Sequence, residues 1–168
     1  MRRLVRSACI GVLLLGVLAP ATSLAHPVKD DVVKFEAKLS GANEVPPVNT
    51  EGAGVATMKL VNDRTELRFR LLVKNLTDVV QAHIHLGPAG VNGPVVVFFL
   101  HPGEAAPGPF TGLLAEGSAT AADLVGPLAG HPFSELVDAM LTGNAYVNVH
   151  TVANPGGEIR GQVVVVDD

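Results

Sequence analysis

Residues 81–99 of the chain read QAHIHLGPAGVNGPVVVFF, and the fold can be worked out from this stretch outward. The pattern predicts a strand, a turn at Asn92-Gly93 and a second, almost wholly apolar strand, because Asn and Gly adopt positive φ at little cost. Side chains alternate between the two faces of a strand, so His83 and His85 are expected on one face and Ile84 on the other. The stretch therefore predicts a hairpin that holds two imidazole rings side by side.

The first 25 residues have the composition of a signal peptide. Three arginines precede an apolar run over residues 10–18, and small residues lead to a cleavage site after Ala25. The apolar run is too short to span a bilayer, and no later segment resembles a transmembrane helix. We therefore expect a signal peptide over 1–25, a polar N-terminal lead over 26–32 and one domain over 33–168, secreted or periplasmic.

The composition excludes several classes of function. The chain has 12 Lys and Arg and 16 Asp and Glu, and three arginines lie in the signal, so the mature charge is 9 − 16 = −7. This sign disfavours a nucleic-acid partner. The single cysteine, Cys9, also lies in the signal, so the mature chain has neither a disulfide nor a cysteine nucleophile. No serine-nucleophile, phosphate-loop or dinucleotide motif is present, which favours a protein that is not an enzyme.

Alternating patterns along the chain predict an all-β fold. Residues 33–39, 54–60, 67–73 and 145–149 alternate between apolar and polar side chains, and the 18 glycines and 12 prolines favour short strands joined by tight turns. One amphipathic segment predicts a short helix near 132–142. We count about eight strands, which indicates an immunoglobulin-like, Greek-key β-sandwich.

Five segments of the chain resemble the CHRD (chordin-type) domain family. They read LSGANEVPP (39–47), AHIH (82–85), GPVV (93–96), AYVNVHT (145–151) and NPGGEIRGQ (154–162). They occur in order over nearly the whole mature chain. The resemblance implies an immunoglobulin-like β architecture and a single-domain module of the type found in exported bacterial proteins. It identifies no partner, so the expected ligand is an unknown protein or other extracellular molecule, and no oligomeric state is predicted.

A second pattern is similar to that of copper/zinc superoxide dismutases. In those enzymes a His-x-His strand and a later histidine bind copper, and an arginine near the C-terminus guides the anionic substrate. By this resemblance His83, His85 and His150 would be copper ligands and Arg160 the guiding arginine. The chain departs from the pattern because it has no histidine-rich zinc loop, no evident bridging histidine and no subunit disulfide.

The residues thus support two functional hypotheses. One is a binding or structural module of undetermined ligand, in which Asn148, Thr151 and Glu158 tie His150 into a polar network around a turn. The other is a copper-binding protein, with or without redox activity, since neutral imidazoles from two strands suit copper or zinc. A further copper hypothesis uses His26, which would become the mature N-terminus and could chelate through its amine and ring.

Two turns are expected to be structurally important, at Asn92-Gly93 and at Gly156-Gly157. At least one glycine of the second turn is expected to need positive φ. The residues assigned to these turns and their flanks are Asn92, Gly93, Gly156, Gly157, Glu158 and Arg160.

The signal-peptide interpretation predicts that the mature protein begins at His26. Mass spectrometry of protein recovered from outside the cytoplasm measures this mass directly. Recovery of a chain that still carries Met1, or one that begins beyond Val33, would contradict the prediction.

Overall fold

The computed structural model of the chain describes residues 32–166, so the predicted signal peptide and His26 lie outside the described residues. The described part is an all-β fold with one α-helix, as expected, and no helix in it is long and apolar enough to cross a membrane. The strands are β1 (Lys34–Ser40), β2 (Ala53–Val61), β3 (Glu66–Leu86), β4 (Val95–Leu100), β5 (Ala106–Ala119), β6 (Ala145–Thr151), β7 (Ile159–Gln162) and β8 (Val164–Val166). The helix is α1 (Phe133–Leu141), and short 3₁₀ turns form η1 (Gly41–Asn43), η2 (Ala121–Asp123) and η3 (Gly126–Leu128).

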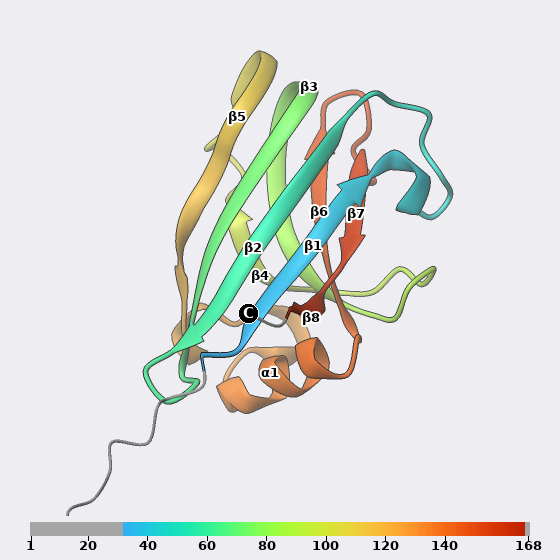
Figure 1. The fold of residues 1–168 in the computed structure, drawn as a ribbon. Coiled ribbons are helices and arrows are strands. Elements are labelled where there is room, and N and C mark those ends of the chain that lie inside the picture. The colour runs from blue at the N-terminus through green and yellow to red at the C-terminus, as the bar shows by residue number, and fades with distance from the viewer. Residues whose placement is uncertain (1–31, 167–168) are drawn as a thin grey trace, which may run out of the picture.

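The eight strands form one sheet that closes into a barrel-like arrangement. The pairing order is β2-β1-β7-β6-β3, and β3 also pairs with β2, which completes the ring. Strands β4 and β5 pair with β3, and β8 pairs with β1. Figure 1 shows β5, β3, β2 and β1 running side by side, with α1 across one end of the barrel. The expected Greek-key sandwich of two sheets is not confirmed, because the strand pairs are continuous around the ring.

Strand β3 is the reason that the sheet closes. Its first half, up to Lys74, pairs with β2, and its second half, from Val79 to Leu86, pairs with β6. Between them Asn75 and Asp78 have φ of 55° and 52°, and the register with β5 shifts on both sides of Leu76 and Thr77. Such bulges bend a strand and increase its twist. One strand of 21 residues thus replaces the two strands that the sequence pattern had indicated.

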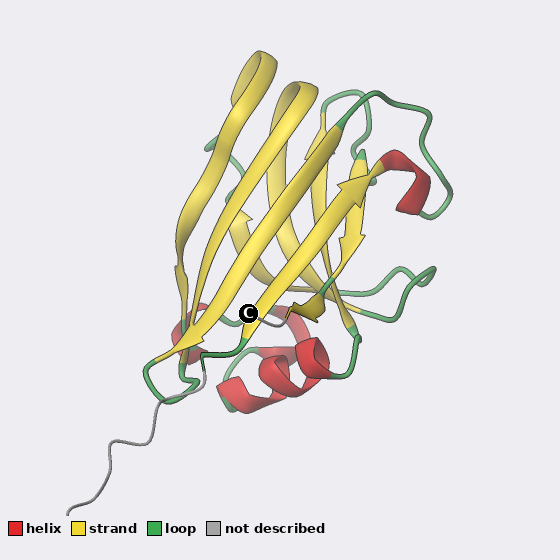
Figure 2. Ribbon diagram, viewed as in Figure 1, coloured by secondary structure: helices red, strands yellow, loops and turns green. Residues whose placement is uncertain are grey.

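The core lies inside the ring and continues beneath the helix. Ala82 and Ile84 of β3 and Val147 and Val149 of β6 are fully buried. At the end of the barrel α1 buries four residues of its apolar face, Phe133, Leu136, Val137 and Met140, whereas Leu141, which follows the same helical spacing, is exposed. Figure 2 shows that the strands make up the body of the molecule while α1 lies across one end of it. The helix predicted near 132–142 is therefore confirmed.

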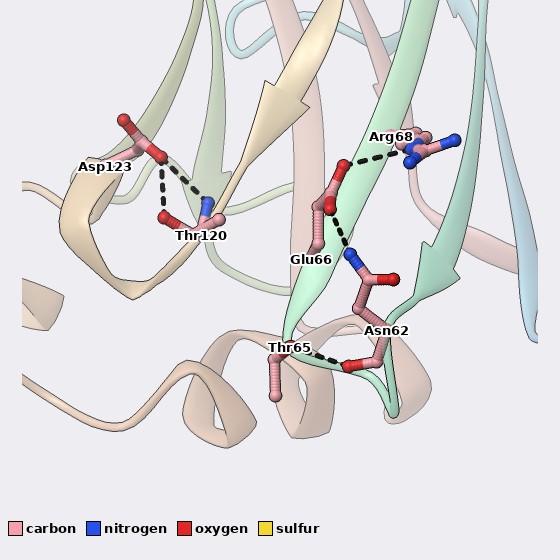
Figure 3. Close-up of polar contacts among 6 residues, drawn as sticks. All are labelled: Asn62, Thr65, Glu66, Arg68, Thr120 and Asp123. Carbon is pink, nitrogen blue, oxygen red and sulfur yellow. Dashed lines mark hydrogen bonds and ion pairs between the residues drawn. The ribbon is translucent and has the colours of Figure 1, made fainter.

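Local polar contacts fix two of the connections. Asn62 begins the turn between β2 and β3, where its amide donates to Glu66 and its carbonyl oxygen accepts from the Thr65 hydroxyl (Figure 3). At the end of β5, Thr120 and Asp123 form a capping box, with the Thr120 backbone N–H donating to Asp123 Oδ2 at 2.8 Å (Figure 3).

The predicted two-residue turn at Asn92-Gly93 is wrong, although the hairpin itself is present. Residues 87–94 form a longer loop, which the Leu86 N–H closes by donating to Pro94 O at 3.0 Å. Neither Asn92 nor Gly93 has positive φ. Gly93 is required for another reason: a Cβ there would lie 1.6 Å from the backbone oxygen of Leu86. The backbone of Leu86 thus comes too close to position 93 for any side chain. Turn rules, which consider only neighbouring residues, do not describe such a contact.

The turn at residues 154–157 conforms to expectation at Gly157, whose φ is 125°. A Cβ at Gly157 would lie 2.6 Å from both Asn148 Nδ2 and Glu44 Oε1, whereas a Cβ at Gly156 would meet nothing within 4 Å. Gly157 therefore needs both its backbone conformation and its missing side chain.

We predict that Gly157→Val lowers the free energy of unfolding by about 1–3 kcal/mol, because the backbone is strained and a side chain collides with buried polar groups. The matched control is Gly156→Val, which has open space around it and should unfold close to the parent. Chemical denaturation of the three proteins measures both values. Equal stability of the two variants would contradict this account of the turn.

Candidate metal centre

Three histidines of two neighbouring strands lie on the face of the sheet that points away from the core. On β3, His83 and His85 alternate with the core residues Ala82 and Ile84. On β6, His150 is paired in register with Gln81, so it lies diagonally across from His83. Period-two alternation in two paired strands is therefore sufficient to place all three rings on one face.

The structure brings the three predicted ligands together. Nδ1 of His83 lies 3.2 Å from Nε2 of His85, and one nitrogen from each of the three rings falls within 4.8 Å of the others. The ring centroids of His83 and His150 are 4.7 Å apart. No other group of three metal-ligating side chains is this compact among residues 32–166.

Backbone carbonyls set the orientation of two of the rings. His85 Nδ1 lies 2.8 Å from Gly93 O, and His150 Nδ1 lies 2.9 Å from Pro155 O. A carbonyl only accepts, so each Nδ1 carries the proton and each Nε2 carries the lone pair. Carbonyls hold histidine ligands in this way in established metal sites. His150 Nε2 is buried and has no hydrogen-bond partner among the described residues.

Burial keeps all three rings neutral at pH 7. The residues are only 2% (His83), 8% (His85) and 6% (His150) exposed. Burial, together with the other nearby histidines, lowers the pKa of His83 to about 3. Burial also lowers the pKa of His85 and of His150, although their carbonyl contacts partly oppose the shift. Neutral imidazole is the protonation state that binds metals.

Aromatic rings enclose the cluster. Tyr146 stacks on His85 with ring centroids 4.7 Å apart and an interplanar angle of 7°. Phe98, the β4 partner of His83, meets its ring edge-on at 5.0 Å. The Arg160 guanidinium lies 3.4 Å from the ring centroid of Tyr146. His83 and His85 are thus each packed against an aromatic side chain and are shielded from solvent.

Arg160 does not lie where the dismutase resemblance would put a guiding arginine. It is 1% exposed and donates to Asn92 Oδ1, Pro88 O and Val91 O. These contacts tie the loop of residues 87–94 to β7. The same loop supplies the Gly93 carbonyl that orients His85, so the buried Arg160 helps to hold His85 in its orientation.

Sequence reasoning placed Asn148 in a polar network with His150, but it did not connect Glu44 with this site. Asn148 is paired with His83 across β6 and β3, and its amide donates to both Glu44 carboxylate oxygens at 3.0 and 3.2 Å. Burial raises the pKa of Glu44 to about 7, although Arg160 and the hydrogen bonds from Val45 and Asn148 favour the charged form. Alternation along β6 puts Asn148 on the same face as His150, but only the fold brings Glu44 to Asn148.

The polar network expected around the 154–157 turn exists, but its centre is Glu158. The Glu158 carboxylate accepts from Thr50, Thr151 and Asn154. His150 contributes separately, through its contact with Pro155 O. The network therefore satisfies Glu158 and leaves His150 Nε2 available.

The geometry suits an ion shared by the three rings. With metal–nitrogen bonds of about 2.0–2.1 Å, tetrahedral ligation puts ligand nitrogens about 3.3 Å apart. The 3.2 Å between the His83 and His85 nitrogens agrees with that separation. The ligand nitrogens of all three rings lie within 4.8 Å of one another, so the rings would have to move closer together for all three to bind one ion.

The buried histidines predict a pH-dependent stability for the metal-free protein. An unfolded histidine has a pKa near its ordinary 6.5, and the pKa of folded His83 is about 3, so stability present above pH 6.5 is lost as pH falls toward 3. Glu44 acts in the opposite direction, because its raised pKa favours the folded state at low pH and that contribution is lost as pH rises from 4.5 to about 7.

The variant His83→Gln isolates the contribution of His83. Its stability should keep the pH dependence that comes from Glu44, His85 and His150 and lose the part that comes from His83. The stability advantage of the parent over the variant should therefore shrink as pH falls from 7 to 5. Urea unfolding in the presence of a chelator measures the difference at each pH. A difference that stays constant over this range would contradict the neutral, buried state of His83.

Comparison with known proteins agrees with the resemblance noted in the sequence. The CHRD domain family matches residues 35–163. Chordin of Xenopus laevis is 31% identical over 138 residues, which cover 77% of this chain and 13% of chordin. The chain thus spans about an eighth of the length of that relative, and no solved structure matches it. Because the family match extends over most of the chain, from β1 to the residue after β7, the protein belongs to the CHRD domain family.

Proposed function

We propose that this CHRD domain is an exported binding module that holds one copper ion through His83, His85 and His150. The observation that carries the proposal is the orientation of His85 and His150. Each presents an Nε2 lone pair because its Nδ1 faces a carbonyl oxygen, and His150 Nε2 is buried with no hydrogen-bond partner among residues 32–166. Such preorganisation is what distinguishes a ligand set from histidines that merely pack.

The chemistry of the donors supports copper. Imidazole nitrogen binds copper and zinc well, and among divalent ions of the first transition row copper binds most tightly to a given set of donors. An oxidising compartment outside the cytoplasm, which the composition of residues 1–25 indicates, is also where copper is encountered as Cu²⁺. Zinc is the closest competitor and is best excluded by measurement.

The site is suited to binding rather than to catalysis. The three rings are buried, and aromatic side chains cover His83 and His85. A substrate would have to displace these side chains to reach the ion. We therefore propose a protein that stores, carries or is stabilised by its metal, and whose outer surface contacts an extracellular partner.

A purely structural role is the second candidate. The 3.2 Å contact between His83 and His85 is also a satisfactory hydrogen bond between two neutral rings. In that case the three histidines would only fasten the loops of residues 87–94 and 152–157 to the sheet. The orphaned His150 Nε2 is the observation that this candidate leaves unexplained.

Isothermal titration of the metal-free protein with Cu²⁺ tests the proposal. We expect one ion per chain, binding lost in His85→Ala, and binding retained in His131→Ala, whose ring is exposed and pairs with Glu135 instead. Bound metal should also raise the thermal midpoint of the parent, because it binds only the folded state.

Two outcomes contradict the three-histidine site. Undiminished binding in His85→Ala would place the ion elsewhere, with His26 as the next candidate. Absence of binding in the parent would leave the structural role. A parallel titration with Zn²⁺ shows whether copper is the preferred ion.

A further inference from the structure

Two orphaned polar atoms occupy neighbouring positions on the histidine face of β6. Among residues 32–166, the buried side-chain atoms without a hydrogen-bond partner are Asn148 Oδ1, His150 Nε2 and Gln162 Oε1. Asn148 and His150 are two residues apart, so their side chains project from the same face of the strand. Buried acceptors are nearly always satisfied in folded proteins, so two orphans at adjacent positions call for a shared explanation.

The orientation of the Asn148 amide is fixed by its neighbour. Nδ2 donates to both oxygens of Glu44, and the ionised carboxylate, the form present above its pKa of about 7, cannot donate in return. The carbonyl oxygen is therefore the end of the amide that remains free. Asn148 is 3% exposed and its Oδ1 is closed off from solvent, so that bulk water does not satisfy it.

Asn148 is also adjacent in the sheet to two of the proposed ligands. It is the direct cross-strand partner of His83 and precedes His150 by one position on the same face. Directly opposed residues in a sheet have Cβ atoms about 4.5–5.5 Å apart, close enough for both side chains to reach one ion. Asn148 and the three histidines thus occupy adjacent positions of the same two strands.

We propose, resting on the function proposed above, that Asn148 Oδ1 is a fourth ligand and completes an N₃O donor set with His83, His85 and His150. One ion would then satisfy both orphaned atoms of β6. Four-coordinate sites built on three histidines are well suited to divalent ions. An amide oxygen is a harder donor than imidazole, so the set favours Cu²⁺ over Cu⁺. Glu44 is the positioning residue, because it holds the amide with its oxygen free.

The test compares copper affinities of the parent and Asn148→Leu. Leucine has a similar size and lacks the donor oxygen. We expect the affinity for Cu²⁺ to fall by about tenfold or more, since even the loss of residues that only orient metal ligands costs about 10–100-fold. The affinity for Cu⁺ should change much less, because three imidazoles are sufficient for that ion. Competition titrations with a Cu²⁺ chelator and a Cu⁺ chelator measure the two affinities.

The matched control is Gln81→Leu. Gln81 is the register partner of His150 and belongs to the same face of β3, but its amide is not among the orphaned groups. We expect its Cu²⁺ affinity to equal that of the parent. Equal loss in both leucine variants, or no loss in Asn148→Leu, would overturn the fourth-ligand assignment. A parent that binds no copper would instead overturn the function on which the inference rests.

If Asn148→Leu does not fold, nuclear magnetic resonance of the parent tests whether Asn148 is a ligand. In the parent, addition of Zn²⁺ as a diamagnetic substitute should shift the carbonyl carbon resonance of the Asn148 side chain and leave that of Gln81 in place. An unchanged Asn148 resonance in zinc-bound protein would overturn the assignment.

Discussion

The constraint on which the rest of the structure depends is the alternation of side chains along β3. Ala82 and Ile84 are drawn into the core, and this commits His83 and His85 to the opposite face. A slip of one residue in register would exchange the two sets and expose the apolar side chains. The position of the histidines is thus enforced by the hydrophobic core, and folding itself brings them beside His150 on the paired strand.

A face that carries three histidines would ordinarily be exposed to solvent, and here loops cover it. Arg160 fastens the loop of residues 87–94 through three hydrogen bonds, and Pro155 O of a second loop meets His150. Burial removes water from the imidazoles and lowers their pKa, so that they are neutral at pH 7. Covering polar rings so thoroughly opposes folding unless they acquire partners, and the proposed ion would supply such a partner.

Much of this arrangement could be predicted from the sequence, because it follows from short-range periodicity. The strands, α1, the shared face of His83 and His85 and the special role of Gly157 all depend on residues close together in the chain. The parts that could not be predicted depend on distant ones. The continuous β3 and the closed ring arise from pairing with β2, β5 and β6, the conformation of Asn92 from contacts with Arg160, and the role of Asn148 from a Glu44 that lies 104 residues away.

The central claim is that the histidine face of β3 and β6 is a metal site. Anomalous X-ray scattering at the copper absorption edge, from crystals grown with one equivalent of Cu²⁺, tests it most directly. The account predicts a single strong peak about 2 Å from a nitrogen of each of His83, His85 and His150. Density only at exposed histidines such as His101 or His131, or at the N-terminus, would contradict it.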